Sequence, residues 1–154
     1  MRTRISLVLV AAQLLVGCLS VSAGFNPVRG PLSQRTPVPA YIGSMTGVVL
    51  SGTITVTLDG GEKCTGPWKQ VSKTDPAENV PPPPDVASQW DAVFGSGYYL
   101  AHVLGNGLYM RGIVTGNQGT VLTVEVSNES NRRGETRGIA LDNKGNLFKV
   151  TVYN

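Results

Sequence analysis

Residues 111–126, RGIVTGNQGTVLTVEV, and residues 137–152, RGIALDNKGNLFKVTV, decide the fold, because they repeat one pattern 26 positions apart. The two segments agree at seven of sixteen positions, and each has an Asn-x-Gly turn near its middle. Glycine at the end of such a turn permits the positive φ that a tight hairpin needs. Two copies are too few for a solenoid, so the repeat predicts a meander with two equivalent β-hairpins.

Apolar residues alternate with other residues along the second half of each copy. This period of two is typical of a strand with one buried face. We therefore expect six side chains to point into the core, with Thr123 and Lys149 facing water. The six are Leu122, Val124, Val126, Phe148, Val150 and Val152.

Residues 52–58 predict the clearest strand upstream of the repeat. Threonines 53, 55 and 57 share one face, and Ile54, Val56 and Leu58 share the other. Asp59-Gly60-Gly61 follows as a hairpin turn. We expect residues 62–71 to form the return strand and Gly66-Pro67 to interrupt it, because proline lacks a backbone donor.

Residues 85–94 predict one short helix after a proline-rich loop at residues 72–84. Apolar side chains at 86, 90, 93 and 94 follow helical spacing, with Asp85 as N-cap and Gly95 as C-cap. Residues 98–104, between two glycines, favour a further strand. The predicted fold class is mainly β: an antiparallel meander of hairpins forming a small barrel or sandwich, with one short helix near residues 85–94.

The N-terminal residues have the pattern of an export leader. Arg2 and Arg4 precede an apolar run at residues 5–16, which is shorter than the roughly 20 residues of a spanning helix. Leu15-Val16-Gly17-Cys18 resembles the lipobox of bacterial lipoproteins. The resemblance implies cleavage before Cys18, a diacylglyceryl thioether on its sulfur, and a fatty acyl group such as palmitate on its new amino group.

Leu19, rather than Asp, follows Cys18, so the resemblance implies the outer membrane in a Gram-negative cell. The predicted organisation is a signal peptide at residues 1–17, a flexible tether rich in Ser, Gly and Pro at residues 18–43, and a β-rich domain at residues 44–154. Cleavage after Ala23 is an alternative, because Val21-Ser22-Ala23 also suits ordinary signal peptidase. It would release a soluble periplasmic binding protein without Cys18.

Charge and composition exclude several function classes. Removing the leader leaves 11 basic against 10 acidic residues, a net charge of +1, which does not favour nucleic-acid binding. Cys64 and His102 are the only thiol and imidazole outside residues 1–18, and a hydrolase would depend on that pair. We expect Cys64 to be a small apolar core residue instead. One Cys and one His make no zinc cluster, and residues 142–146 lack calcium-ligand spacing.

Five aromatic residues are candidates for a binding groove, although core packing is their ordinary use. They are Trp68, Trp90, Tyr98, Tyr99 and Tyr109. The repeats also resemble small uncharacterised bacterial lipoproteins, a likeness that implies no activity. We therefore predict a lipid-anchored, non-enzymatic envelope module without a cofactor or metal. Its expected partners are the membrane, through Cys18, and an envelope protein or glycan.

Overall fold

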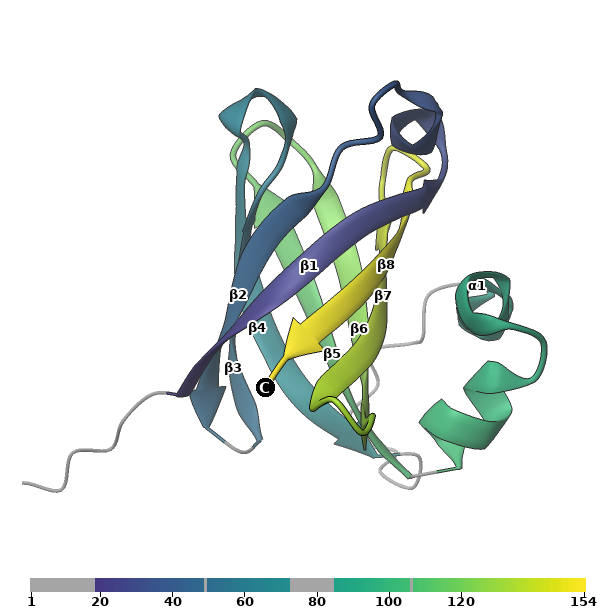
Figure 1. Ribbon diagram of the computed structural model, residues 1–154. Coiled ribbons are helices and arrows are strands. Elements are labelled where there is room, and N and C mark those ends of the chain that lie inside the picture. The colour runs from purple at the N-terminus through teal and green to yellow at the C-terminus, as the bar shows by residue number, and fades with distance from the viewer. Residues whose placement is uncertain (1–18, 49, 73–84, 106) are drawn as a thin grey trace, which may run out of the picture.

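Eight antiparallel strands close into a barrel in the computed structural model, which describes residues 19–48, 50–72, 85–105 and 107–154 (Figure 1). Each strand pairs with the next, and β8 pairs with β1. The strands are β1 (Leu19–Arg29), β2 (Tyr41–Val48), β3 (Ser51–Thr57), β4 (Lys63–Ser72), β5 (Leu108–Gly116), β6 (Val121–Ser130), β7 (Glu135–Asp142) and β8 (Leu147–Tyr153). The predicted mainly β meander is confirmed, and its closed form is a barrel.

The predicted tether at residues 18–43 is wrong, because Leu19–Arg29 forms β1 and β2 begins at Tyr41. Between them lies a short 3-10 helix, η1 (Pro31–Gln34). Four side chains of β1 alternate toward the barrel interior: Val21, Ala23, Phe25 and Pro27. Ala23 and Phe25 are fully buried. The Ser and Gly residues between them face outward, so the low-complexity composition concealed a strand of period two.

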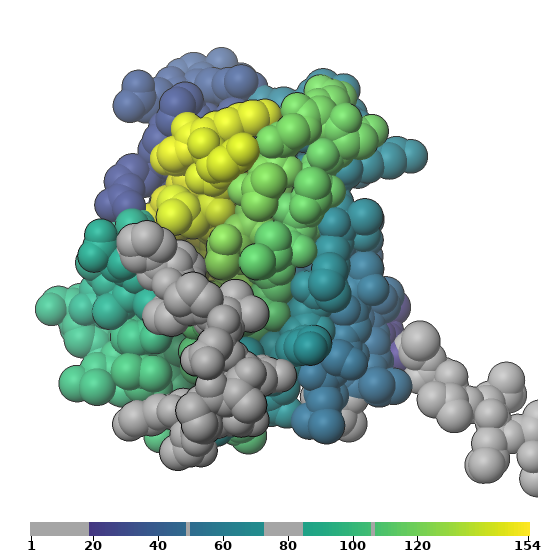
Figure 2. Space-filling view, turned by 180° about the vertical axis from the view of Figure 1, so that it is seen from behind, coloured from purple at the N-terminus to yellow at the C-terminus, as the bar shows by residue number. Residues whose placement is uncertain are grey.

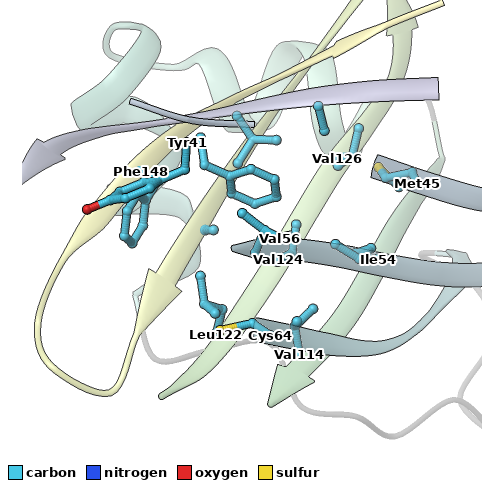
Figure 3. Close-up of a cluster of buried hydrophobic side chains, with 14 of the residues drawn as sticks. Tyr41, Met45, Ile54, Val56, Cys64, Val114, Leu122, Val124, Val126 and Phe148 are labelled. Atoms are coloured by element: carbon cyan, nitrogen blue, oxygen red, sulfur yellow. The ribbon is translucent and has the colours of Figure 1, made fainter. Parts of the chain in front are cut away.

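The barrel interior is packed with the side chains that the alternation predicted to be buried. All six predicted inward residues of the repeat lie in one core cluster, together with Ile54, Val56 and Leu58 of the first hairpin. Lys149 is exposed and Thr123 is partly exposed, as expected. Figure 3 shows this cluster, with Val124, Leu122, Cys64 and Val114 contributed by neighbouring strands.

The turn at 59–61, η2 (Asp59–Gly61), joins β3 to β4 as predicted. The expected break of the strand at Gly66-Pro67 is wrong, because β4 runs through it and Pro67 pairs with Thr53, although the pairing with β5 skips these two residues. Gly66 has a steric role instead. A Cβ there would lie 2.0 Å from the Ile113 carbonyl oxygen, so the close approach of β5 requires glycine.

The asparagine shared by the two repeats joins adjacent hairpins. Asn117 donates its N–H to the Lys63 carbonyl and accepts from the Lys63 N–H at its Oδ1 (3.1 and 3.0 Å). Asn143 makes the same pair of bonds with Val121, both at 3.0 Å. Each repeat turn therefore extends the backbone ladder to the preceding hairpin, which explains why both copies carry Asn at that position.

One side of the outer wall is covered by α1 (Val86–Phe94) and η3 (Tyr99–Leu104), a short π-helix (Figure 2). The helix prediction is confirmed, as is Gly95 at its C-terminus. Asp85 is the N-cap residue, as predicted, but it has a left-handed conformation and makes no side-chain capping hydrogen bond.

The strand predicted at residues 98–104 is also wrong, because η3 occupies this segment. Tyr99 and Val103 are four residues apart and both pack against the barrel wall. That spacing places them on one face of a helical turn. The outer wall beneath is held by Glu125, which accepts hydrogen bonds from Arg111 Nε at 2.7 Å and Trp90 Nε1 at 2.9 Å.

The first prediction concerns the two faces of the repeat strands. Val124→Asp or Val150→Asp places a carboxylate without a partner in the interior, which costs several kcal/mol. Because domains typically have only about 5–15 kcal/mol of stability, either variant should be unfolded or severely weakened. Thr123→Asp should cost far less. Thermal melts of the three variants check this, and equal losses at Thr123 and Val124 would contradict a barrel with one buried face.

Candidate functional site

The two ends of the barrel differ in how they are filled. The closed end carries η1, η2 and the β5–β6 and β7–β8 turns (Figure 1). There Leu32 packs on the core, and its N–H donates to Asn146 Oδ1 at 2.9 Å. Tyr41 donates to Asp59 at 2.7 Å, and Arg35 pairs with the same carboxylate. Side chains and hydrogen bonds therefore seal this end.

Glu62 is a buried acidic residue of the closed end. Its Oε1 accepts from the N–H groups of Gln118 and Thr120, and its Oε2 accepts from the Thr120 hydroxyl at 2.6 Å. These bonds hold the pKa of Glu62 below its ordinary value. The adjoining polar cavity is only about 150 Å³. Because this carboxylate is fully engaged, we interpret the network as structural.

The opposite end, where β1 begins and the chain ends, opens into an apolar cavity of about 390 Å³. We call it the mouth cavity. Its walls come from six strands and the C-terminal residue, so it exists only because the barrel is closed. The lining residues are Leu19, Val21, Met45, Thr46, Gly47, Val48, Trp68, Met110, Thr136, Val152 and Asn154.

Trp68 forms the rigid part of the mouth cavity. Its side chain is nearly buried, and its indole N–H donates to the Thr46 carbonyl at 3.1 Å. A Cβ at Gly52 would lie 2.6 Å from that indole nitrogen, so the ring rests directly against the β3 backbone. Met45 and Met110 form the adaptable part, because a thioether chain fills irregular space in several conformations.

Polar groups of the mouth cavity are few and already paired. Thr136 Oγ1 accepts from Asn154 Nδ2 at 2.9 Å and lies 2.9 Å from the Ser130 hydroxyl. None of the described lining side chains is charged. Because burial of a charge without a partner is costly, the cavity suits an apolar group and disfavours an ionic one.

Only Trp68 of the five predicted binding aromatics lines the mouth cavity. Trp90, Tyr98, Tyr99 and Tyr109 lie on the outer wall, where Trp90 stacks on Tyr98 with ring centroids 5.9 Å apart. Arg111 donates to the Tyr109 hydroxyl at 2.9 Å. The structure thus divides the predicted set between a cavity and the wall that carries α1 and η3, and the five residues form no common groove.

Cys64 and His102 do not meet. Cys64 is fully buried in the interior cluster, where burial and the nearby Glu62 carboxylate raise the pKa of its thiol. His102 lies on η3, outside the wall, 2.8 Å from Glu129. Neither residue therefore activates the other as a nucleophile. Among the described residues no cluster of metal-ligating side chains occurs.

Cys18, the predicted lipidation site, and the signal peptide at residues 1–17 lie outside the described residues. The first described residue, Leu19, lies at the rim of the mouth cavity and is 72% exposed. Within the described part of the chain, no helix is long and apolar enough to cross a membrane. Comparison with protein-family models, curated proteins and solved structures finds no match to this chain.

The second prediction follows from the lowered pKa of Glu62. The Glu62 carboxylate stabilises the folded state at pH values above 4.5, its ordinary pKa. This contribution is lost as the pH falls through the lower pKa that Glu62 has in the folded state. Glu62→Gln should therefore cost roughly 1.5–3 kcal/mol at pH 7, the range for hydrogen bonds to a charge. The loss should shrink as the pH falls below 4.5, because the unfolded wild-type chain then binds a proton that folded Glu62 resists.

Urea unfolding from pH 7 to pH 3 measures this difference. Glu129→Gln is the matched control, because Glu129 lies on the outer wall with about half of its side chain exposed. That variant should have a small effect at pH 7. A Glu62→Gln loss that stays constant down to pH 3 would contradict the electrostatic explanation.

Proposed function

We propose that the protein is a lipid-anchored binding module of the cell envelope that holds an apolar ligand in the mouth cavity. The observation that carries this proposal is the apolar cavity of about 390 Å³, whose described lining side chains carry no charge. Small-molecule pockets fall in a range of about 300–1,000 Å³, and barrel mouths are one of their common locations. An eight-stranded barrel is also just wide enough to hold one small ligand.

The cavity walls favour an apolar ligand over the glycan that the sequence analysis also allowed. A sugar needs several hydrogen-bonding groups directed at it, whereas Thr136 and Trp68 direct theirs to protein atoms. Burial of apolar surface supplies about 25 cal/mol per Å² without such groups. The hydrogen-bonded strand ladder fixes the walls in advance, which lowers the entropic cost of binding.

A lipid anchor on Cys18 would hold the mouth cavity at the membrane. Cys18 is the residue directly before Leu19, and consecutive Cα atoms are about 3.8 Å apart. The anchor would therefore attach at the cavity rim without an intervening tether. Several acyl chains at ~0.8 kcal/mol per methylene hold such a module stably, and we place it at the outer membrane.

Cleavage after Ala23, the alternative, has less support. Residues 19–23 pair with β2 from Gly47 to Gly43, and Ala23 is fully buried. Their loss would remove the start of β1 and two lining residues of the mouth cavity, Leu19 and Val21. A strand edge exposed in this way invites pairing with other chains. Cleavage before Cys18 leaves the described barrel whole.

The third prediction tests the anchor. Cys18→Ser removes the sulfur that would carry the diacylglyceryl group, so metabolic labelling with a fatty acid should disappear from the protein. The wild-type chain should be labelled and should sediment with membranes. Cys64→Ser is the matched control and should keep the label. Label that persists in the Cys18 variant would contradict the anchor.

The fourth prediction tests the cavity with oleate and residues 19–154, which contain all eight strands. Val21→Phe enlarges a lining side chain. If the ring displaces about two methylene groups of the ligand, at ~0.8 kcal/mol each, affinity should fall roughly tenfold.

Ile113→Phe is the control for this measurement. Ile113 is 46% exposed and lies outside the core clusters, so its enlargement should leave oleate affinity unchanged. Titration with labelled oleate gives both affinities. Equal oleate affinity of the wild type and Val21→Phe would mean that oleate binds outside the mouth cavity. No binding to either protein would contradict the proposed ligand.

A further inference from the structure

We infer that the open end of the barrel rests on the bilayer, and that the mouth cavity takes one acyl chain of a membrane phospholipid directly from it. The inference rests on the proposed anchor and ligand site, and it names the ligand class and the route of entry. Its starting point is the surface around the cavity, which is apolar as well.

The rim of the cavity exposes three large aliphatic side chains. Leu19, Val48 and Leu50 are 72%, 54% and 64% exposed. They are neighbours, because Leu19 pairs with Gly47 across β1 and β2, and Leu50 follows in the turn to β3. Large aliphatic side chains grouped at one end of a molecule indicate a membrane or partner surface.

The rim and the cavity form one continuous apolar surface. Leu19 and Val48 are exposed to solvent and also line the cavity, while Met45 and Trp68 lie further in and are nearly buried. A hydrocarbon chain that enters from a bilayer placed against this rim stays in contact with apolar groups throughout. A chain that enters from water would first have to leave an aggregate or a membrane.

Two arginines lie at the open end of the barrel, across the mouth cavity from the aliphatic rim. Arg132 and Arg133 occupy the exposed β6–β7 turn, and the acidic residues Glu129 and Glu135 lie in the strand ends on either side of it. The N–H of Asn154, a lining residue, donates to the Gly134 carbonyl at 3.2 Å, so this turn adjoins the cavity. Cations near a membrane surface attract anionic phospholipid headgroups.

The lining decides which part of the lipid enters. No described lining side chain carries a charge, and Thr136 is already bonded to Asn154. A phosphate would lose its hydration inside without gaining a partner. The acyl chain therefore occupies the cavity, and the headgroup remains outside at the level of the arginines.

Fluorescence quenching by brominated lipid tests this inference on the mature, acylated protein. The protein is reconstituted into vesicles of phosphatidylethanolamine and phosphatidylglycerol whose acyl chains carry bromine, which quenches indole emission at contact. Trp68 lines the cavity, whereas Trp90 belongs to α1 and is fully buried between this helix and the outer wall. We expect loss of most Trp68 emission, and Trp68→Phe should remove the quenchable component.

Val48→Asp and Val38→Asp form a matched pair, because the two valines are 54% and 50% exposed and lie at opposite ends of the barrel. Both variants should sediment with the vesicles through the anchor. Val48→Asp should restore Trp68 emission, whereas Val38→Asp should be quenched like the wild type. Circular dichroism checks the fold, and Leu50→Asp, in the turn before β3, repeats the test.

The outcomes separate this inference from the proposed function. Sedimentation with vesicles but unquenched Trp68 would overturn the inference and leave the anchor in place. Equal quenching of the two valine variants would overturn the role of the rim. Dimerisation through the rim would also overturn the inference, because a second copy would then cover the mouth cavity. Such dimers would appear as a concentration-dependent increase in mass that is absent from Val48→Asp. If the wild-type protein did not sediment with the vesicles, both the anchor and the inference would be contradicted.

Discussion

Pairing between β1 and β8 is the constraint on which the rest of the structure depends. Seven residues of β1 find partners in β8, from Ser22 opposite Tyr153 to Arg29 opposite Leu147. This seam joins the two ends of the described chain and leaves no strand with a free edge. Without it the interior would be one face of an open sheet, and the mouth cavity would lack its β1 and β8 walls. The seam also puts the start of β1 at the cavity rim.

The outer wall depends on a second, more local arrangement. Glu125 is almost fully buried, and Arg111 and Trp90 satisfy its carboxylate from β5 and from α1. A buried ion pair contributes stability only when its geometry and remaining hydrogen bonds are complete. Here those bonds also fix where the helical segment lies. The predicted aromatic residues on this wall therefore have a structural use, and the open end is left as the candidate site.

Much of the fold could be predicted because it is encoded in local alternation. The inward faces of the repeat and of β3 follow from a period of two, and the turn glycines follow from the required positive φ. β1 was missed because Val21, Ala23 and Phe25 alternate with Ser and Gly in a stretch that resembles a linker. The cavity could not be predicted from any single segment. Its lining combines residues as distant as Val21 and Val152, which meet only through the register of the closed barrel.

The length of β1 would determine the reach of a protein anchored at Cys18, because β1 begins at the next residue. The strand has eleven residues, and at about 3.3 Å per residue it extends roughly 36 Å. With Cys18 acylated, the closed end would stand no further than about that height above the lipid. Such a protein could not sample the space beyond, and it would diffuse in two dimensions with its mouth always presented to the same leaflet. Encounters with other envelope components would then depend on what reaches that thin layer, and exchange of lipid with a distant membrane would require a partner that bridges the gap.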